Sequence, residues 1–168
     1  MVALIYVAKT NHSEKMVVMS QEVKILFKHT EFNEPGVEGI WAKPYGEYYI
    51  LDNIPFYVRN YALGDIISAI LENEELYANS LIQESGNSVV RVLFSNTNTL
   101  TPLRQKLKKM GCASELSNLP NLIAIDIPPS VSYRKVITEL DNGEKAGDWE
   151  YEEGCISNLH KEQMRTTC

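Results

Sequence analysis

The stretch from residue 89 to residue 156 constrains the fold most, because strand and helix patterns alternate along it. The apolar run VVRVLF at residues 89–94 is typical of a buried strand. A helix is predicted next, with Thr101 as its N-cap and Pro102 at its first helical position, where the missing N–H costs nothing. Its apolar face consists of Leu103, Leu107 and Met110. Gly111 is expected to end this helix in a left-handed conformation.

The rest of this stretch completes a βαββαβ order. Two strands are predicted at residues 112–116 and 121–127. A second helix is expected from Ser130, its cap, to the Asp-Asn-Gly turn that ends at Gly143. A last strand is predicted at residues 148–156. Strands and helices in this order form the ferredoxin-like unit.

The first half of the chain is predicted to consist of strands. Strand patterns occur at residues 23–29, 38–44, 46–52, 66–72 and 76–84, and the last two are expected to form a hairpin about Asn73-Glu74. A helix at residues 63–71 is the alternative for one of them, but the β-branched pair Ile66-Ile67 after Gly64 favours a strand. Short strands at close spacing indicate a small barrel. The predicted fold class is therefore α+β, with an N-terminal small β-barrel-like sheet followed by a ferredoxin-like βαββαβ domain.

The chain is expected to divide into four segments. These are an N-terminal arm at residues 1–20, a β-rich subdomain at 21–86, the ferredoxin-like subdomain at 87–157 and a polar, frayed tail at 158–168. The short connection SGNS between the halves indicates that they pack together. No apolar run reaches the roughly 18 residues of a membrane span, and the N-terminus lacks a signal-peptide pattern. A cytoplasmic protein without membrane association is therefore expected.

The sequence shows no pattern of catalytic, metal-binding or cofactor-binding residues. Its histidines and cysteines are scattered without ligand spacing: His12, His29, His160, Cys112, Cys155 and Cys168. Glycine-rich phosphate loops are missing from the sequence. The strand at residues 89–94 offers only Phe94 for base stacking, and the net charge of −6 opposes binding of a polyanion. We therefore expect no catalytic activity, metal, cofactor or nucleic acid.

An acidic stretch interleaved with aromatic residues ends the ferredoxin-like half. Carboxylates can steer a basic partner toward a surface, while aromatic side chains anchor it. The expected partner-binding residues are Asp148, Trp149, Glu150, Tyr151, Glu152 and Glu153. The alternative interpretation is a solvated edge strand whose charge resists aggregation.

The central segment carries several short motifs. A tryptophan-bearing strand leads to LDNIPFY, then LGD, and later a Ser-Gly-x-Ser element precedes Arg-Val. The positions are Trp41, residues 51–57, residues 63–65, Ser85, Gly86, Ser88, Arg91 and Val92. With these motifs the chain resembles the bacterial domain-of-unknown-function family 4265, over about residues 23–156. The resemblance implies no established activity. LDNIPFY is interpreted as scaffold, with Asp52-Asn53 closing an Asx-type turn and Phe56 filling a core.

By class, a small acidic protein of this kind resembles the immunity proteins of contact-dependent and polymorphic toxin systems. The predicted function is a protein-binding inhibitor that neutralises a cognate bacterial toxin, such as a nuclease, by covering its basic active site. Two alternatives stay open at this point. One is a nucleic-acid or small-ligand binding regulatory module, and the other is an enzyme that uses dispersed residues.

Overall fold

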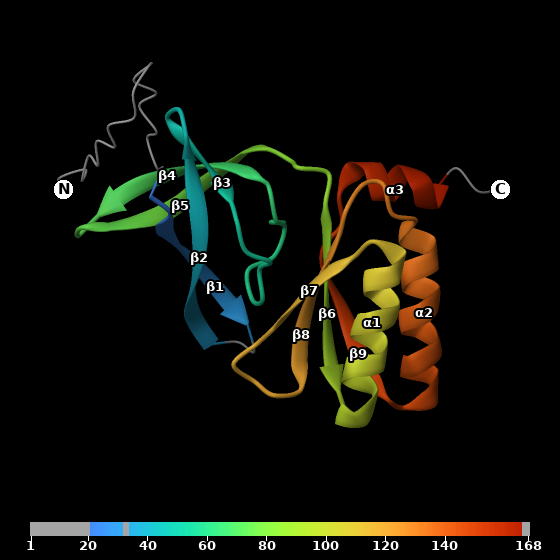
Figure 1. The fold of residues 1–168 in the computed structure, drawn as a ribbon. Coiled ribbons are helices and arrows are strands. Elements are labelled where there is room, and N and C mark those ends of the chain that lie inside the picture. Colours follow the sequence, from blue (N-terminus) through green and yellow to red (C-terminus); the bar gives the residue numbers. More distant parts are fainter. Residues whose placement is uncertain (1–20, 32–33, 166–168) are drawn as a thin grey trace, which may run out of the picture.

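In a computed structural model, which describes residues 21–31 and 34–165, the chain forms two sheets and three α-helices (Figure 1). The first sheet contains β1 (Val23–Glu31), β2 (Glu34–Tyr45), β3 (Tyr48–Leu51), β4 (Ile66–Glu72) and β5 (Glu75–Gln83). Neighbouring strands in the order β1 to β5 pair antiparallel. Because β1 also pairs with β5, in parallel through Ile25 and Leu26, the sheet closes on itself.

The β4–β5 connection is a two-residue turn that the sequence anticipates. Asn73 and Glu74 both take left-handed conformations, with φ of 48° and 68°. A two-residue hairpin turn needs positive φ at both central positions to match the twist of the strands. The strand predicted at residues 66–72 is confirmed, and the alternative helix there is wrong.

The second sheet carries the helices. Its elements are β6 (Ser88–Phe94), α1 (Leu100–Met110), β7 (Ala113–Leu116), β8 (Leu122–Ile127), α2 (Tyr133–Ala146), β9 (Trp149–Cys155) and α3 (Asn158–Arg165), with a short 3₁₀ turn at Thr97–Thr99. The strands lie in the order β7-β8-β6-β9, all antiparallel. Helices α1 and α2 cover one face of this sheet, and the first sheet lies on the other side (Figure 1). The expected mixture of α and β structure is confirmed.

Both main helices differ from the sequence prediction at their ends. Helix α1 begins one residue before Thr101, so its N-cap is Thr99. Helix α2 begins after Ser132, not after Ser130, and passes through Gly143 to end at Gly147. Gly143 does not end α2 because it is used for packing. The Trp149 ring lies against this glycine, where an added Cβ would be 1.8 Å from Trp149 Cζ2. Gly147 takes the left-handed conformation that a helix end favours, with φ of 78°.

The prediction of a frayed C-terminal tail is wrong for residues 158–165, which form α3. His160 on this helix is 0% exposed, its Nδ1 lies 2.7 Å from Ser88 Oγ, and its ring stacks on Tyr133. Next to this pair, Gly86 lies so close to Leu159 that a Cβ there would be 3.1 Å from the leucine Cδ1. The sequence of α3 shows no apolar pattern that would predict these contacts, because the one side chain that this helix buries is a histidine. The arm expected at residues 1–20 lies outside the described residues.

A long connecting loop, residues 52–65, lies between the two sheets (Figure 1). Its buried residues Ile54 and Ala62 form an apolar cluster with Val89 and Ala124 of the second sheet. The two halves therefore share a small core, separate from the larger core beneath α1 and α2. None of the helices in the described part of the chain has the length and apolarity that crossing a membrane requires.

Candidate functional site

Glu38 of β2 fixes the middle of the connecting loop. Its carboxylate accepts hydrogen bonds from the backbone N–H groups of Phe56 (2.6 Å), Tyr57 (2.9 Å) and Val58 (2.8 Å). Hydrogen bonds to an ionised acceptor are stronger than those between neutral groups. Glu38 therefore sets where the aromatic side chains of Phe56 and Tyr57 stand.

Arg91 of β6 joins the loop to the second sheet. Its guanidinium is buried, donates from Nη2 to the carbonyl of Val58 (2.6 Å) and donates from Nη1 to Glu152 Oε1 (2.8 Å). Arg59 donates to the other oxygen of Glu152 at 2.7 Å. Gly154 makes room for the guanidinium, because a Cβ there would lie 3.1 Å from Arg91 Nε. The buried charge of Arg91 is thus compensated by a carboxylate, as a buried ion requires.

Asp65, the last residue of the LGD motif, holds the end of the loop. It is buried and accepts hydrogen bonds from the N–H groups of Ala62 and Ser85, both at 2.8 Å. Burial raises the pKa of this carboxyl, and the two N–H groups oppose the rise. At the other end of the loop, Asn53 Oδ1 accepts from the N–H of Trp41 at 3.2 Å. The motif residues of the loop therefore tie backbone segments together.

A cavity of about 350 Å³ lies between the loop and the face of the second sheet that the helices leave open. We call it the sheet-face cavity. Its lining consists of Phe56, Tyr57, Arg91, Leu93, Leu119, Leu122, Glu150, Tyr151 and Glu152. Leu93 and Leu122 lie opposite each other on β6 and β8, and Leu93 and Leu119 are each 45% exposed. Apolar side chains thus form the floor, and two glutamates stand on β9 beside them.

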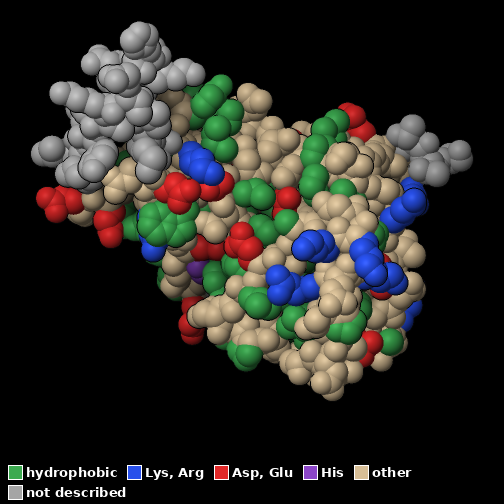
Figure 2. All heavy atoms as spheres, viewed as in Figure 1, with side chains coloured by type: hydrophobic (Ala, Val, Ile, Leu, Met, Phe, Trp, Pro, Cys, Tyr) green, Lys and Arg blue, Asp and Glu red, His purple; other side chains and the backbone are tan. Residues whose placement is uncertain are grey.

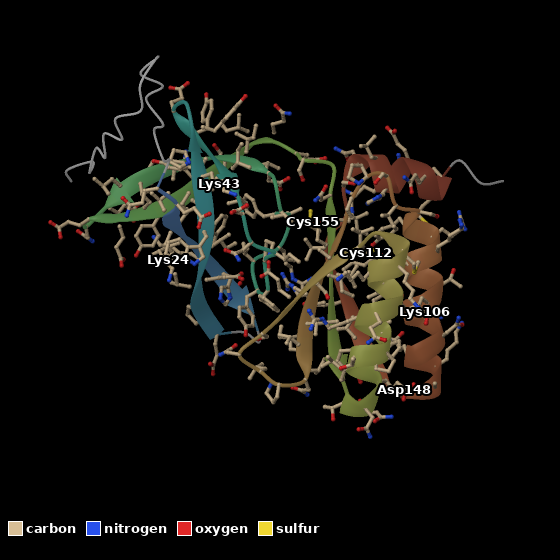
Figure 3. All side chains as sticks on the ribbon, in the orientation of Figure 1. Lys24, Lys43, Lys106, Cys112, Asp148 and Cys155 are labelled. Atoms are coloured by element: carbon tan, nitrogen blue, oxygen red, sulfur yellow. The ribbon has the colours of Figure 1, made fainter. Side chains whose placement is uncertain are left out.

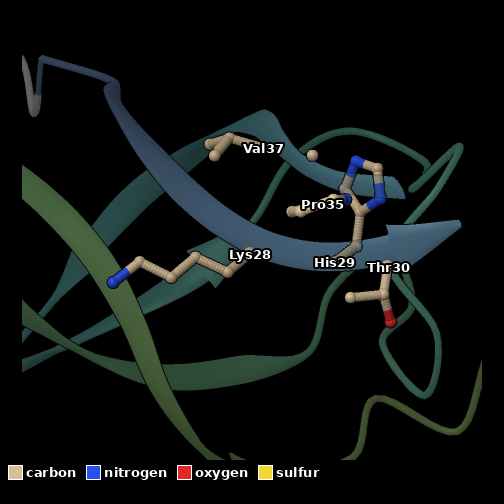
Figure 4. A pocket seen from close by; sticks show the side chains of 6 residues that line it. Lys28, His29, Thr30, Pro35 and Val37 are labelled. Atoms are coloured by element: carbon tan, nitrogen blue, oxygen red, sulfur yellow. The ribbon is translucent and has the colours of Figure 1, made fainter. Parts of the chain in front are cut away.

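A second hollow of about 580 Å³ lies at the end of the β1–β2 hairpin where residues 28–30 pair with residues 35–37 (Figure 4). The His29 ring lies over Gly36 there, so close that a Cβ on the glycine would be 2.4 Å from His29 Cε1. Figure 4 shows the Lys28 side chain extending away from that ring. The imidazole and the ammonium group therefore do not converge on a ligand position. The sheet-face cavity is the better candidate, although it is smaller.

The six residues predicted to bind a partner divide between the two faces of β9. Trp149 is only 6% exposed, and its Nε1 donates to the carbonyl of Leu140 at 3.0 Å. The hydroxyl of Tyr151 donates to Asp141 at 2.5 Å, and Glu153 accepts from Tyr133 at 2.6 Å. These three side chains face the helical layer, and Tyr151 in addition borders the sheet-face cavity at the edge of that layer's core. The anchoring role predicted for Trp149 is therefore corrected, because a buried ring cannot meet a partner.

Glu150 and Glu152 lie on the opposite face, where they line the sheet-face cavity. Asp148 lies at the start of β9, far from Cys155 near the other end (Figure 3), and accepts a hydrogen bond from Asn96 at 3.1 Å. The sequence patterns did not single out Arg91 or Leu93 as site residues. The alternation along β6 was the available signal for them, because it places both on the face opposite Val90 and Val92.

The two cysteines in the described part of the chain, Cys112 and Cys155, offer little nucleophilic chemistry. Burial raises the pKa of Cys112 and of Cys155 to about 11, so both thiols stay protonated at neutral pH. Within the described residues, no three His, Cys, Asp or Glu side chains converge as a metal site would need.

Fold and site together define an α+β protein with two sheets and an apolar, glutamate-rimmed cavity where the halves meet. Residues 38–151 match the family described as "Domain of unknown function (DUF4265)", and the chain belongs to that family. The family resemblance seen in the motifs is confirmed, over a shorter span than residues 23–156.

The fold also occurs in a solved structure. A crystal structure of a hypothetical protein from Neisseria gonorrhoeae superimposes with a TM-score of 0.75 at 19% sequence identity, covering 82% of this chain and 96% of that one. At this identity the likeness concerns the fold alone. No curated protein matches the chain.

Proposed function

We propose that the chain is a non-enzymatic protein that binds a basic protein partner through the sheet-face cavity and its rim. The observation that carries this proposal is the exposure of Leu93 and Leu119 beside Glu150, at the part of the sheet face that the connecting loop leaves open. Exposed apolar groups rimmed by polar residues are typical of interaction sites. The contact residues are Asp148, Glu150 and Glu152 together with the two leucines, and Trp149 is not among them.

Charge supports a basic partner. The chain has a net charge of −6, which favours encounter with a positively charged protein. Lys and Arg side chains gather over the helical layer in Figure 2. The narrower form of the proposal is an immunity-type inhibitor, acting in the cytoplasm, that covers the basic active site of a cognate toxin. Identification of the bound partner as a toxin would establish this narrower form.

The finer fold assignment belongs to the same proposal. We infer a small β-barrel from the closure of the first sheet through β1 and β5. The second half fits the ferredoxin-like class, since α1 follows β6, α2 follows β8 and the sheet order is β7-β8-β6-β9.

The test is capture of the partner from host cells by the native chain and by the double variant Leu119→Asp with Glu150→Lys. The matched control is Leu71→Asp with Glu74→Lys at the β4–β5 turn, where Leu71 is 68% exposed. We expect one basic protein to be retained by the native chain and the control and lost by the variant, followed by a direct titration of the purified pair. Equal retention by all three proteins, or retention of no basic protein, would overturn the proposal.

Small-ligand binding is the second candidate function, and the size of the cavity favours it. At about 350 Å³ the sheet-face cavity falls in the range of about 300–1,000 Å³ that small-molecule sites occupy. A thermal-shift screen of metabolites distinguishes this candidate, because a ligand of the cavity raises the unfolding temperature of the native chain.

A further inference from the structure

The lining of the sheet-face cavity has one carboxylate without an ion-pair partner in the described part of the chain. Arg91 pairs with Glu152, which Arg59 also contacts. Glu150 is exposed and forms no ion pair with any residue in 21–31 or 34–165. Arg59 and Arg91 thus both lie at Glu152, whereas the carboxylate of Glu150 has no cation of the described residues beside it. A single positive charge would complement it.

The remainder of the lining is suited to an apolar stem. Leu93 and Leu122 provide an aliphatic floor, and Leu119 closes one side. Phe56 and Tyr57 add aromatic rings, which attract cations through their π faces. A long side chain that buries its methylene groups and presents a charged end matches both features, as lysine and arginine do.

The aromatic wall is in place before any ligand arrives. Glu38 binds the backbone of Phe56 and Tyr57 (2.6 and 2.9 Å), as described above. The Tyr57 ring is also stacked on His29, with 5.5 Å between ring centroids and 19° between planes. A preformed wall lowers the ordering cost of binding.

We propose that the sheet-face cavity receives the side chain of one lysine or arginine from the partner, with its stem on Leu93 and Leu122 and its charge at Glu150. The proposal rests on the protein-binding function and adds the class of residue that is recognised. It also explains why Glu152 is occupied by arginines of this chain, while Glu150 is left for a charge from outside.

The test uses two pentapeptides, acetyl-Ala-Leu-Arg-Leu-Ala-amide and its analogue with citrulline in place of arginine. Citrulline has nearly the same shape without the charge, so the ratio of the two affinities measures charge recognition alone. Titrations followed by backbone amide NMR shifts should give about fivefold tighter binding of the arginine peptide, as for an exposed ion pair. Shifts are expected at Tyr57, Leu93 and Leu122.

Glu150→Gln should abolish the difference between the peptides, and Glu74→Gln at the distant β4–β5 turn should preserve it. Equal affinities in the native chain, a difference that survives Glu150→Gln, or shifts confined to other residues would overturn the proposal. The peptides need no native partner. Retained partner capture without peptide discrimination therefore overturns only the cavity assignment, and peptide discrimination without a captured partner overturns only the protein-binding function.

Discussion

At the scale of single residues, two carboxylates, the half-buried Glu38 and the buried Asp65, fix the irregular segment between the sheets. Glu38 and Asp65 together accept hydrogen bonds from five backbone N–H groups, and four of these groups belong to the connecting loop. A loop of this length has no ladder of its own, so its N–H groups need side-chain acceptors where they are buried. The LDNIPFY and LGD motifs can therefore be understood as the sequence that shapes this loop.

Asp126 on β8 is a buried carboxyl for which the pH dependence of stability can be predicted. Burial, opposed by a hydrogen bond from Asn87, raises its pKa to about 6 from 3.8. Because the folded state holds this proton more tightly than the unfolded state, the contribution of Asp126 to stability is present below about pH 4 and lost as pH rises through 6.

We therefore expect Asp126→Asn to be more stable than the native chain at pH 7.5, by up to about 3 kcal/mol. The advantage should shrink steadily as pH falls from 6 toward 4. Urea unfolding at several pH values measures it. A constant difference across this range would contradict the role of the carboxyl group.

At the scale of elements, Gly143 shows that a glycine inside a helix can make room for a neighbouring side chain. It lies inside α2, and the indole of Trp149 occupies the space that a side chain would take. Gly143→Ala gains about 1 kcal/mol in helix propensity, but it forces the ring out of its position against Phe94. We expect a net loss of roughly 1–3 kcal/mol in the free energy of unfolding.

Thermal unfolding, together with the near-ultraviolet signal of the tryptophans, measures this loss. Asn142→Ala, at the exposed neighbouring position of the same helix, is the matched control and should not lower stability. A Gly143→Ala protein as stable as the control would show that Trp149 can move aside at little cost.

At the scale of the whole molecule, Arg91 couples the two halves. It belongs to the second sheet, yet it donates to the carbonyl of Val58 in the connecting loop. Removing it with Arg91→Met leaves that carbonyl without the guanidinium and leaves Glu152 with Arg59 alone. We expect a loss of roughly 3 kcal/mol. Hydrogen exchange should then show the amides of β1 opening separately from those of β8.

The matched control for Arg91→Met is Arg104→Met. Arg104 bonds Ser114 within the second half, at 2.9 Å, so its loss should leave the two halves coupled. Exchange that stays coupled in the Arg91→Met protein would mean that the apolar cluster of Ile54, Ala62, Val89 and Ala124 suffices to join the halves.

The sequence by itself determined the local elements: the order of strands and helices, the turn at Asn73-Glu74 and the family motifs. These follow from alternation, helical spacing and turn residues, which act over a few positions. Only the tertiary structure decided which face of β9 meets the helices, and hence that Trp149 is buried while Glu150 lines a cavity. It also decided that a polar C-terminal segment docks through His160 on Ser88. Both depend on contacts between residues far apart in the chain, and no local pattern specifies which surfaces those contacts cover.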